Sequence, residues 1–212
     1  MSAHLSIDDQ LRCVLASRTP LLLPIDPRRR QAAVLLPVFH DGSALHLVFT
    51  KRTDTLKHHK GQVSFPGGTV EPSDGDLLTT ALRESDEELG IHPEHVVVLG
   101  RLDDLATFST SFMISPFVGL IPYPYPFRPN PVEVASVFAV PLSVLADPAV
   151  VRRYIRTRED RATLVDYEFH VGGHVIWGAT ARILHHFLQV IGAIPPVAES
   201  GTAAPTSGSA PR

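Results

Sequence analysis

Three glutamates lie within one and a half turns of each other in the stretch RESDEELG, residues 83–90. In a helix, Glu84 and Glu88 lie about 40° apart and Glu87 about 60° to the other side of Glu84, whereas Asp86 points away. Like charges one turn apart cost a helix about 0.2–0.5 kcal/mol per pair. A bound cation would offset that cost, and carboxylate oxygens favour Mg²⁺ or Mn²⁺. The alternative is a solvated acidic face.

The glycines around this stretch favour the metal site. Gly67 and Gly68 precede a loop that leads into the predicted helix, and glycine allows backbone carbonyls to approach a ligand closely. Gly90 is a typical helix stop. The predicted buried face of the helix consists of Leu78, Ala81, Leu82, Ser85 and Leu89. The carboxylates should therefore lie at the rim of the core.

The segment 67–91 resembles the Nudix box, G-x5-E-x7-R-E-U-x-E-E-x-G-U, where U is aliphatic. The matching positions are Gly68, Arg83, Glu84, Glu87, Glu88, Gly90 and Ile91. The resemblance implies a hydrolase in which Glu84 and Glu88 are the main metal ligands. Glu87 would be a further ligand or a supporting group, and it is one candidate for the general base. The Gly68 carbonyl would complete the ligands, and Arg83 would orient a glutamate, so these residues are the catalytic and metal-binding candidates.

Two positions depart from the Nudix box. The loop is one residue too long, so no glutamate stands eight residues before Arg83, and Asp74 and Asp76 are the candidates to replace it. Ser85 stands where the box has an aliphatic residue, which should loosen helix packing and leave the chemistry intact.

The segment LVFTKRTDTLKHHKGQVSFPGG, residues 47–68, resembles the signature of the coenzyme A pyrophosphatase branch. That signature is L-L-T-x-T-(S/A)-x3-R-x3-G-x3-F-P-G-G. The matching positions are Thr50, Gly61, Phe65, Pro66, Gly67 and Gly68, and the departures are Val48, Phe49, Arg52, Thr53 and Lys57. The additional loop residue is also typical of this branch. The resemblance implies cleavage of coenzyme A to 4′-phosphopantetheine and adenosine 3′,5′-bisphosphate.

Basic residues in the same segment suit such a substrate. Coenzyme A carries a diphosphate and a 3′-phosphate, which charge-assisted hydrogen bonds would hold. The candidate substrate-binding residues are Arg52, Lys57, His59, Lys60 and Phe65. The basic residues could instead form a solvated loop. Another dinucleotide such as NADH or ADP-ribose is an alternative substrate, and a catalytically silent nucleotide-binding domain is the alternative of a different class.

Two further features leave alternatives open. Tyr123, Tyr125 and Phe127 stand in a proline-rich segment, 121–131, that could form an apolar lid over the pantetheine arm or a plain surface loop. Glu133 could be a supporting carboxylate or a base, and it could equally be an ordinary charge at the start of a strand.

Composition excludes several other classes of protein. The chain has 212 residues, 44% of them hydrophobic, and a formal net charge of −3, which gives no bulk electrostatic case for nucleic-acid or membrane binding. The single cysteine, Cys13, suits a reducing cytoplasm. No signal peptide or membrane-spanning run is apparent. We expect a cytoplasmic monomer or homodimer that acts on a small molecule.

The order of predicted elements indicates an α+β protein. A helix at 6–17 and a connector at 18–30 precede a hairpin formed by strands 31–39 and 44–52. The acidic helix, 75–89, is followed by strands within 94–108, 111–121 and 132–141, a helical turn, two further strands that lead through Gly172-Gly173 into a third, and a helix at 178–191. We expect the Nudix fold, a mixed β-sheet sandwiched between helices. The expected division is an N-terminal helix and connector (1–30), a Nudix domain (31–194) and a disordered tail (195–212).

Overall fold

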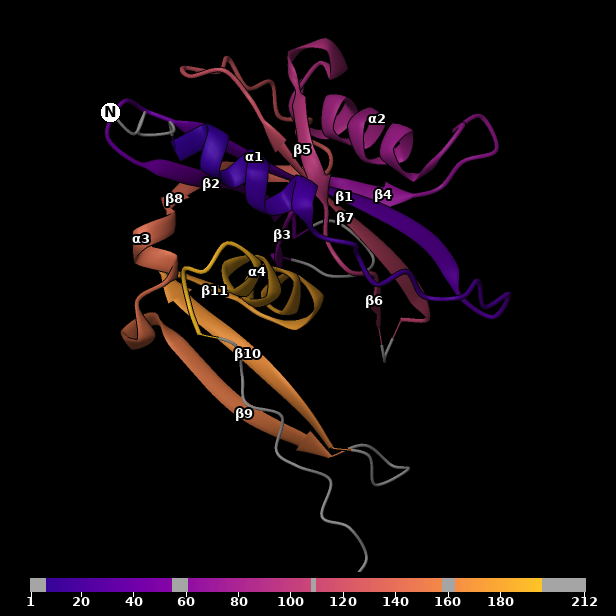
Figure 1. Ribbon diagram of the computed structural model, residues 1–212. Coiled ribbons are helices and arrows are strands. Elements are labelled where there is room, and N and C mark those ends of the chain that lie inside the picture. Colours follow the sequence, from indigo (N-terminus) through magenta and orange to yellow (C-terminus); the bar gives the residue numbers. More distant parts are fainter. Residues whose placement is uncertain (1–6, 55–60, 108–109, 158–162, 196–212) are drawn as a thin grey trace, which may run out of the picture.

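The computed structural model describes residues 7–54, 61–107, 110–157 and 163–195 (Figure 1). Its elements in chain order are α1 (Ile7–Ser17), β1 (Arg30–His40), β2 (Leu45–Arg52), β3 (Val63–Ser64), β4 (Gly67–Thr69), α2 (Leu77–Leu89), β5 (Val97–Arg101), β6 (Leu105–Ala106), β7 (Phe112–Leu120), β8 (Val134–Pro141), α3 (Leu142–Leu145), β9 (Val151–Thr157), β10 (Thr163–Val171), β11 (His174–Ile176) and α4 (Gly178–Val190). Short 3₁₀ helices occur at Pro93–His95 and Pro148–Val150.

The main sheet is mixed, as the sequence predicts. Its strands follow the order β3-β2-β1-β7-β5, with β4 paired to β1, β6 to β7 and β8 to β2. Strands β1 and β7 run parallel, and the other pairs run antiparallel. The predicted hairpin of β1 and β2 is present, with Val38 opposite Leu47, and an Asp41-centred turn joins the two strands.

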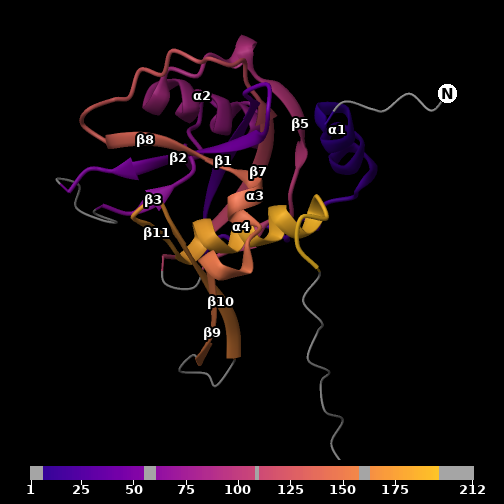
Figure 2. The same cartoon turned by 90° about the vertical axis from the view of Figure 1, so that its left-hand side faces the viewer.

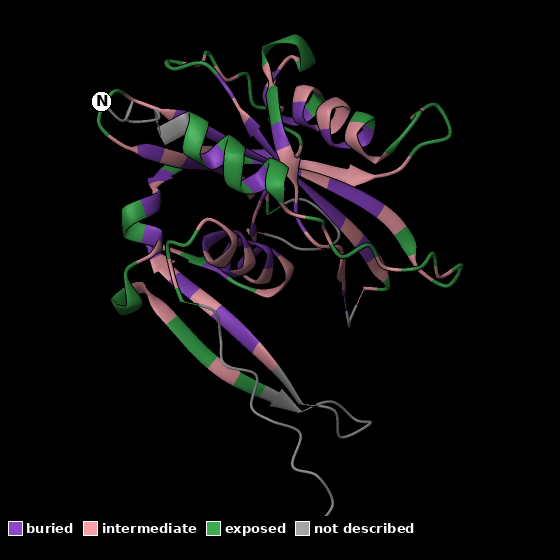
Figure 3. Ribbon diagram, viewed as in Figure 1, coloured by how far each residue is buried: buried purple, intermediate pink, exposed green. Residues whose placement is uncertain are grey.

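Helices cover both faces of this sheet (Figure 2). Helix α2 packs on one face, over Ala33 and Leu35 of β1. Helices α1 and α4 lie on the other face, where the largest core cluster includes Leu15, Phe49 and Phe187. Figure 3 shows the buried residues along the central strands and on the inward sides of α2 and α4. The prediction of an α+β sandwich is confirmed.

A second sheet, in the order β11-β10-β9, extends away from the main body (Figure 1). Helix α4 packs against β10, and Phe169 of β10 and Phe187 of α4 are fully buried. The predicted turn at Gly172-Gly173 joins β10 to β11, and both glycines have positive φ. This small sheet and α4 close the face of the main sheet opposite α2.

Some boundaries differ from those predicted. Helix α2 begins at Leu77 because Asp76 caps it, accepting a hydrogen bond from the Thr79 backbone nitrogen at 2.7 Å. The short strands β3 and β4 have no periodic signal in the sequence. Leu11 and Leu15 of α1 are buried in the same core as α4, so this helix packs on the sheet. Of the expected tail, 195–212, only Pro195 lies within the described residues.

Within the part of the chain that the structure describes, none of the helices has the length and hydropathy needed to cross a bilayer.

Candidate active site

Arg83 is held at the start of the acidic cluster by Asp74. Its Nε donates to one carboxylate oxygen of Asp74 at 2.9 Å and its Nη2 to the other at 3.0 Å, a bidentate pair in which the Asp74 side chain is 2% exposed. Thr80 and the Glu71 backbone nitrogen also donate to Asp74. Arg83 is the main reason that the pKa of Asp74 lies far below its usual range. Of the two candidates for the missing glutamate, Asp74 is therefore the one that pairs with Arg83, and Asp76 caps the helix.

The remaining donors of Arg83 point to the glutamates. Nη2 lies 3.1 Å from Glu84 Oε1 and also donates to the Thr69 carbonyl at 3.2 Å. Nη1 donates to Glu87 Oε2 at 3.2 Å. One guanidinium thus contacts two glutamates of the helix and the backbone of strand β4.

Gly68 lies directly against the Glu84 carboxylate. A Cβ atom at position 68 would stand 2.3 Å from Glu84 Oε1 and 2.4 Å from its Cδ, so no other residue fits without displacing Glu84. At Gly67, φ is +153° and a Cβ would lie 2.3 Å from the Ala33 carbonyl oxygen. Both glycines therefore allow strand β4 to approach Glu84 and strand β1 closely.

Glu88 is the most buried of the glutamates, with a side chain 6% exposed. Burial raises its pKa to about 8, with further increases from the charges of Glu84 and Glu133 and an opposing effect of Arg52. Its Oε2 has no hydrogen-bond partner although it is buried. A buried carboxylate oxygen without a partner is costly and indicates a ligand position.

The other acidic residues of the helix face outward. Glu87 has a side chain 58% exposed and is held only by Arg83 among the ion pairs of the described residues. Asp86 pairs with His92 at 2.9 Å, away from Glu84 and Glu88, which agrees with the predicted helical register. Burial also raises the pKa of Glu84. The structure therefore brings Glu84 and Glu88 together at the rim of the core and leaves Glu87 beside them in solvent.

The predicted substrate-binding residues are placed differently from one another. Arg52 lies at the carboxylates, with Nη1 3.9 Å from Glu88 Oε1 and with a buried Nε that has no partner. Phe65 is 3% exposed and stacks on Phe49 with ring centroids 5.0 Å apart, on the α4 face of the sheet. Phe65 is thus a core residue, and this placement does not fit the predicted contact with a substrate. Lys57, His59 and Lys60 lie outside the described residues.

Glu133 is a fourth carboxylate close enough to the cluster to act on it electrostatically. Its charge contributes to the raised pKa of both Glu84 and Glu88. Its backbone carbonyl accepts a hydrogen bond from the Thr53 nitrogen at 2.9 Å, which fixes the start of β8 beside the end of β2. Of the two sequence interpretations, this position favours a supporting carboxylate. A single glutamate before a strand is too weak a signal to identify by itself.

The oxygen atoms of Glu84 and Glu88 suit a divalent cation. Among the described residues, no three His, Cys, Asp or Glu side chains are grouped closely enough to hold a metal ion. The carboxylate oxygens of Glu84 and Glu88 are nonetheless hard ligands of the kind that divalent cations prefer, and Glu88 Oε2 is buried without a hydrogen-bond partner. Gly68 has no side chain that would fill the space beside Glu84. A cation between these groups would compensate their mutual repulsion.

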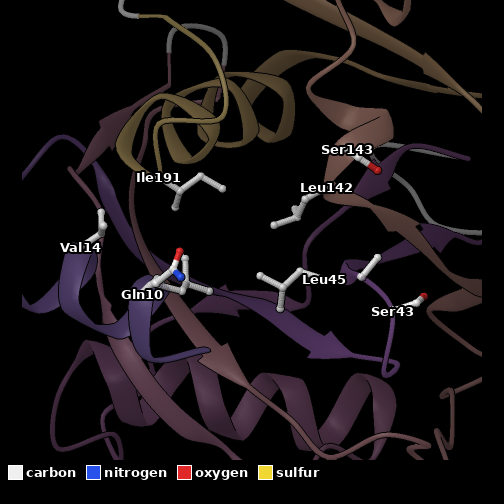
Figure 4. Close-up of a pocket in the computed structure, with 9 residues that line it drawn as sticks. Gln10, Val14, Ser43, Leu45, Leu142, Ser143 and Ile191 are labelled. Carbon is white, nitrogen blue, oxygen red and sulfur yellow. The ribbon is translucent and has the colours of Figure 1, made fainter. Parts of the chain in front are cut away.

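A separate cavity of about 510 Å³ lies on the opposite face, between α1, the β1–β2 turn, α3 and the end of α4 (Figure 4). Its lining is mostly apolar and consists of Leu11, Val14, Ala44, Leu45, Leu142 and Ile191, with the polar residues Gln10, Ser43 and Ser143. Among these lining residues none is charged, so this cavity offers no group for diphosphate chemistry.

Comparison with known proteins places the site in a family context. The NUDIX domain family model matches residues 28–160. The uncharacterized Nudix hydrolase NudL of Photorhabdus laumondii is 39% identical over 180 residues, which are 82% of this chain and 95% of that protein. NudL of Citrobacter koseri is 39% identical over 201 residues, covering 92% and 99%. The crystal structure of a MutT/nudix family protein from Enterococcus faecalis is similar in fold, with a TM-score of 0.53 and 13% identity over 89% of this chain and 70% of that one.

Proposed function

The chain belongs to the Nudix hydrolase family, and we propose that it is a metal-dependent pyrophosphohydrolase that cleaves the diphosphate of coenzyme A and its oxidised or acyl derivatives. The products would be 4′-phosphopantetheine and adenosine 3′,5′-bisphosphate. Nudix hydrolases act on small nucleotide-containing substrates and generally need divalent metal ions such as Mg²⁺ or Mn²⁺.

The observation that carries this proposal is the contact between Gly68 and Glu84. Gly68 ends the segment that resembles the coenzyme A branch, and Glu84 begins the acidic cluster. The two sequence signatures overlap at Gly67 and Gly68, and this shared pair lies against the first glutamate of the acidic cluster. The pairing of Asp74 with Arg83 supports the same branch, because it shows how the longer loop keeps the arginine in place.

In the proposed mechanism, water attacks one phosphorus atom of the diphosphate. Glu84, Glu88 and the Gly68 carbonyl would hold the cation, with Glu87 as a further or supporting ligand. When bound, the cation neutralises charge on the phosphoryl oxygens and lowers the pKa of water. Arg83 fixes Glu84 and Glu87 through two separate nitrogens, so the ligands are oriented before the substrate arrives. The guanidinium of Arg52 lies beside Glu88, where it can contact a phosphate of the substrate.

The proton of the attacking water needs a carboxylate acceptor within reach. Glu87 is exposed and contacted by Arg83, and Glu133, just before β8, lies near enough to act on the same cluster electrostatically. Either carboxylate could act as a general base. Replacing each with glutamine and comparing the pH dependence of kcat would distinguish them, because only loss of the base removes the acidic limb.

Mass spectrometry of the products tests the proposed reaction. Coenzyme A, dephospho-coenzyme A, NADH and ADP-ribose would each be incubated with the enzyme and Mg²⁺ or Mn²⁺, with Glu84→Gln as the matched inactive protein. We expect 4′-phosphopantetheine and adenosine 3′,5′-bisphosphate from coenzyme A at the highest kcat/KM of the panel. If NADH or ADP-ribose had the higher kcat/KM, that compound would be assigned as the substrate in place of coenzyme A. If no compound were cleaved with either metal, the protein would be a nucleotide-binding domain and not an enzyme.

A further inference from the structure

We propose that the aromatic groove beside the carboxylates binds the pantetheine arm of the substrate, the uncharged chain that is attached to one phosphate of the diphosphate. This inference rests on the proposed function. The groove is a cavity of about 370 Å³. Its lining consists of Phe39, Val48, Tyr123, Pro124, Tyr125, Phe127, Pro129, Val137, Phe138 and Ala139.

The groove begins close to the carboxylates and leads away from them. Val137 of β8 lies opposite Thr50, and Ala139 lies opposite Val48 on the same pair of strands. Arg52, which lies beside Glu88, is two residues beyond Thr50 and four beyond Val48 on β2. With a strand rise of about 3.3 Å per residue, the groove covers distances of about 7 to 13 Å from Arg52 along the strand. A chain that extends from a phosphate at Arg52 would therefore enter it.

The outer wall of the groove is fixed to the helix that carries the glutamates. Figure 2 shows the segment between β7 and β8 passing beside α2 before it enters β8. The backbone nitrogen of Asn130 donates to the Glu88 carbonyl at 2.9 Å, and that of Arg128 donates to the Leu89 carbonyl at 2.8 Å. The Tyr125 hydroxyl donates to the Gly90 carbonyl at 3.1 Å. The groove and the acidic cluster are thus held in one arrangement.

The chemistry of the lining selects an uncharged and largely apolar group. None of the described lining residues is charged, so the groove does not suit a phosphate. The Tyr125 hydroxyl is already occupied by Gly90, the His92 nitrogen and His95. Among the lining side chains only the tyrosine hydroxyls can hydrogen-bond, so the edge of a nucleobase buried here would depend mainly on backbone groups. The methyl and methylene groups of the pantetheine arm have no such requirement.

The strand that forms the floor also suits the amides of the arm. Among the described strands, β8 pairs only with β2, so no described strand covers its outer edge. An extended chain that carries secondary amides can hydrogen-bond to such an edge in the manner of an added strand. A pantetheine arm could place its methyl groups against the aromatic side chains and its amides along β8. This combination fits the groove better than a nucleoside does.

Each product contains one half of coenzyme A, so inhibition by each product reports separately on the binding of that half. Ala139→Trp fills the groove from an exposed position, and Ala149→Trp makes the same change at an exposed alanine outside it. We expect Ala139→Trp to weaken inhibition by 4′-phosphopantetheine on the order of tenfold or more. Inhibition by adenosine 3′,5′-bisphosphate should change less than about twofold, and Ala149→Trp should leave both constants at the wild-type values.

A second variant protects the conclusion against misfolding. Tyr123→Ala removes a side chain that is 55% exposed and stacks on Phe39 at the groove, so it should raise KM for coenzyme A with little effect on kcat. The proposal is overturned if Ala139→Trp weakens inhibition by adenosine 3′,5′-bisphosphate and not by 4′-phosphopantetheine. It is also overturned if the variant weakens inhibition by both products equally, or changes neither inhibition constant. Failure of the wild type to cleave coenzyme A would be a different result, because it refutes the proposed function itself.

Discussion

The two faces of the main sheet treat polar groups differently. On the α4 face, the buried side chains are mainly apolar, with Phe49 and Phe65 in ring contact and Phe187 fully buried. On the α2 face, the helix buries Glu88 and Ser85 together with its apolar residues. Glu88 Oε2 lacks a partner there, and Arg52 Nε does too. On the α4 side, His186 Nε2 is also buried without a hydrogen-bond partner, so the contrast between the faces is one of degree: the α2 face holds the buried carboxylate, and the α4 face holds most of the aromatic core.

Strand β2 shows how a single strand serves both faces. Successive residues alternate between the faces, so Phe49 joins the α4 core whereas Val48 joins the cluster beside α2. Arg52, an even number of residues from Val48, reaches Glu88 at the end of the same face. A sheet that is stabilised by apolar packing on one face can tolerate unfavourably buried charged groups on the other. Such a cost in stability is common at active sites.

The largest effect should come from breaking the apolar face. Phe187→Ala removes a fully buried ring from α4 and should lower the free energy of unfolding by about 3–5 kcal/mol. Urea denaturation followed by circular dichroism measures this change. Val144→Ala, at a side chain 41% exposed on α3, is the matched control and should cost less than about 1 kcal/mol. Similar losses for the two variants would mean that the α4 face is not the main source of stability.

The polar face should respond in activity and not in stability. Glu88→Gln removes a proposed ligand charge and should lower kcat by on the order of 10²-fold or more. Measured without metal, its free energy of unfolding should equal or exceed that of the wild type, because burial already disfavours the Glu88 charge and raises its pKa to about 8. Asp86→Asn, on the outward side of α2, is the control and should retain activity. If Asp86→Asn were as damaging as Glu88→Gln, the assignment of ligands on this helix would have to change.

The sequence predicted the elements better than it predicted which side chains meet. The apolar runs of β1 and β2 and the acidic helix are local patterns, and they were located to within a few residues. Phe65 shows the limit, because a motif fixes the position of a residue in the chain and not the face of the sheet to which it points. Its neighbour two residues before, Val63, is also buried in the α4 core, and this alternation was the available signal.

The choice between Asp74 and Asp76 depended on a turn that the sequence left open. Both residues precede the helix, and only the path of the loop decides which one reaches Arg83. Asp76 is occupied as the helix cap, through its contact with the Thr79 nitrogen. A search for the cap motif would have left Asp74 as the partner. The role of Glu133 depends on β8 pairing with β2, a long-range contact that no local pattern encodes.

A smaller effect should follow from loosening the ligands without removing them. Asp74→Asn takes the charged partner from Arg83 and should cost about 1–3 kcal/mol in transition-state stabilisation, which is about 5- to 150-fold in kcat/KM. Asp76→Asn is the control, because asparagine caps a helix as well as aspartate does. Both variants would be assayed on the substrate identified by the product analysis. A larger loss for Asp76→Asn would show that the helix start, and not the orientation of Arg83, limits the reaction.

The smallest effect concerns an exception on the apolar face. His185 of α4 is buried and stacks on Tyr167 with ring centroids 3.7 Å apart. Burial is the main reason that its pKa falls to about 4 from the ordinary value of 6.5. The unfolded chain therefore binds a proton at His185 between pH 6.5 and 4 that the folded protein does not bind. This group contributes a loss of stability as pH falls through that window and almost none above pH 7. His185→Phe keeps the stacked ring and removes the titration, so urea midpoints measured at pH 7.5 and 5 should differ less for the variant than for the wild type. An equal difference for both proteins would assign the acid sensitivity to other groups, and a larger one for the variant would show that His185 is charged in the folded protein and stabilises this face.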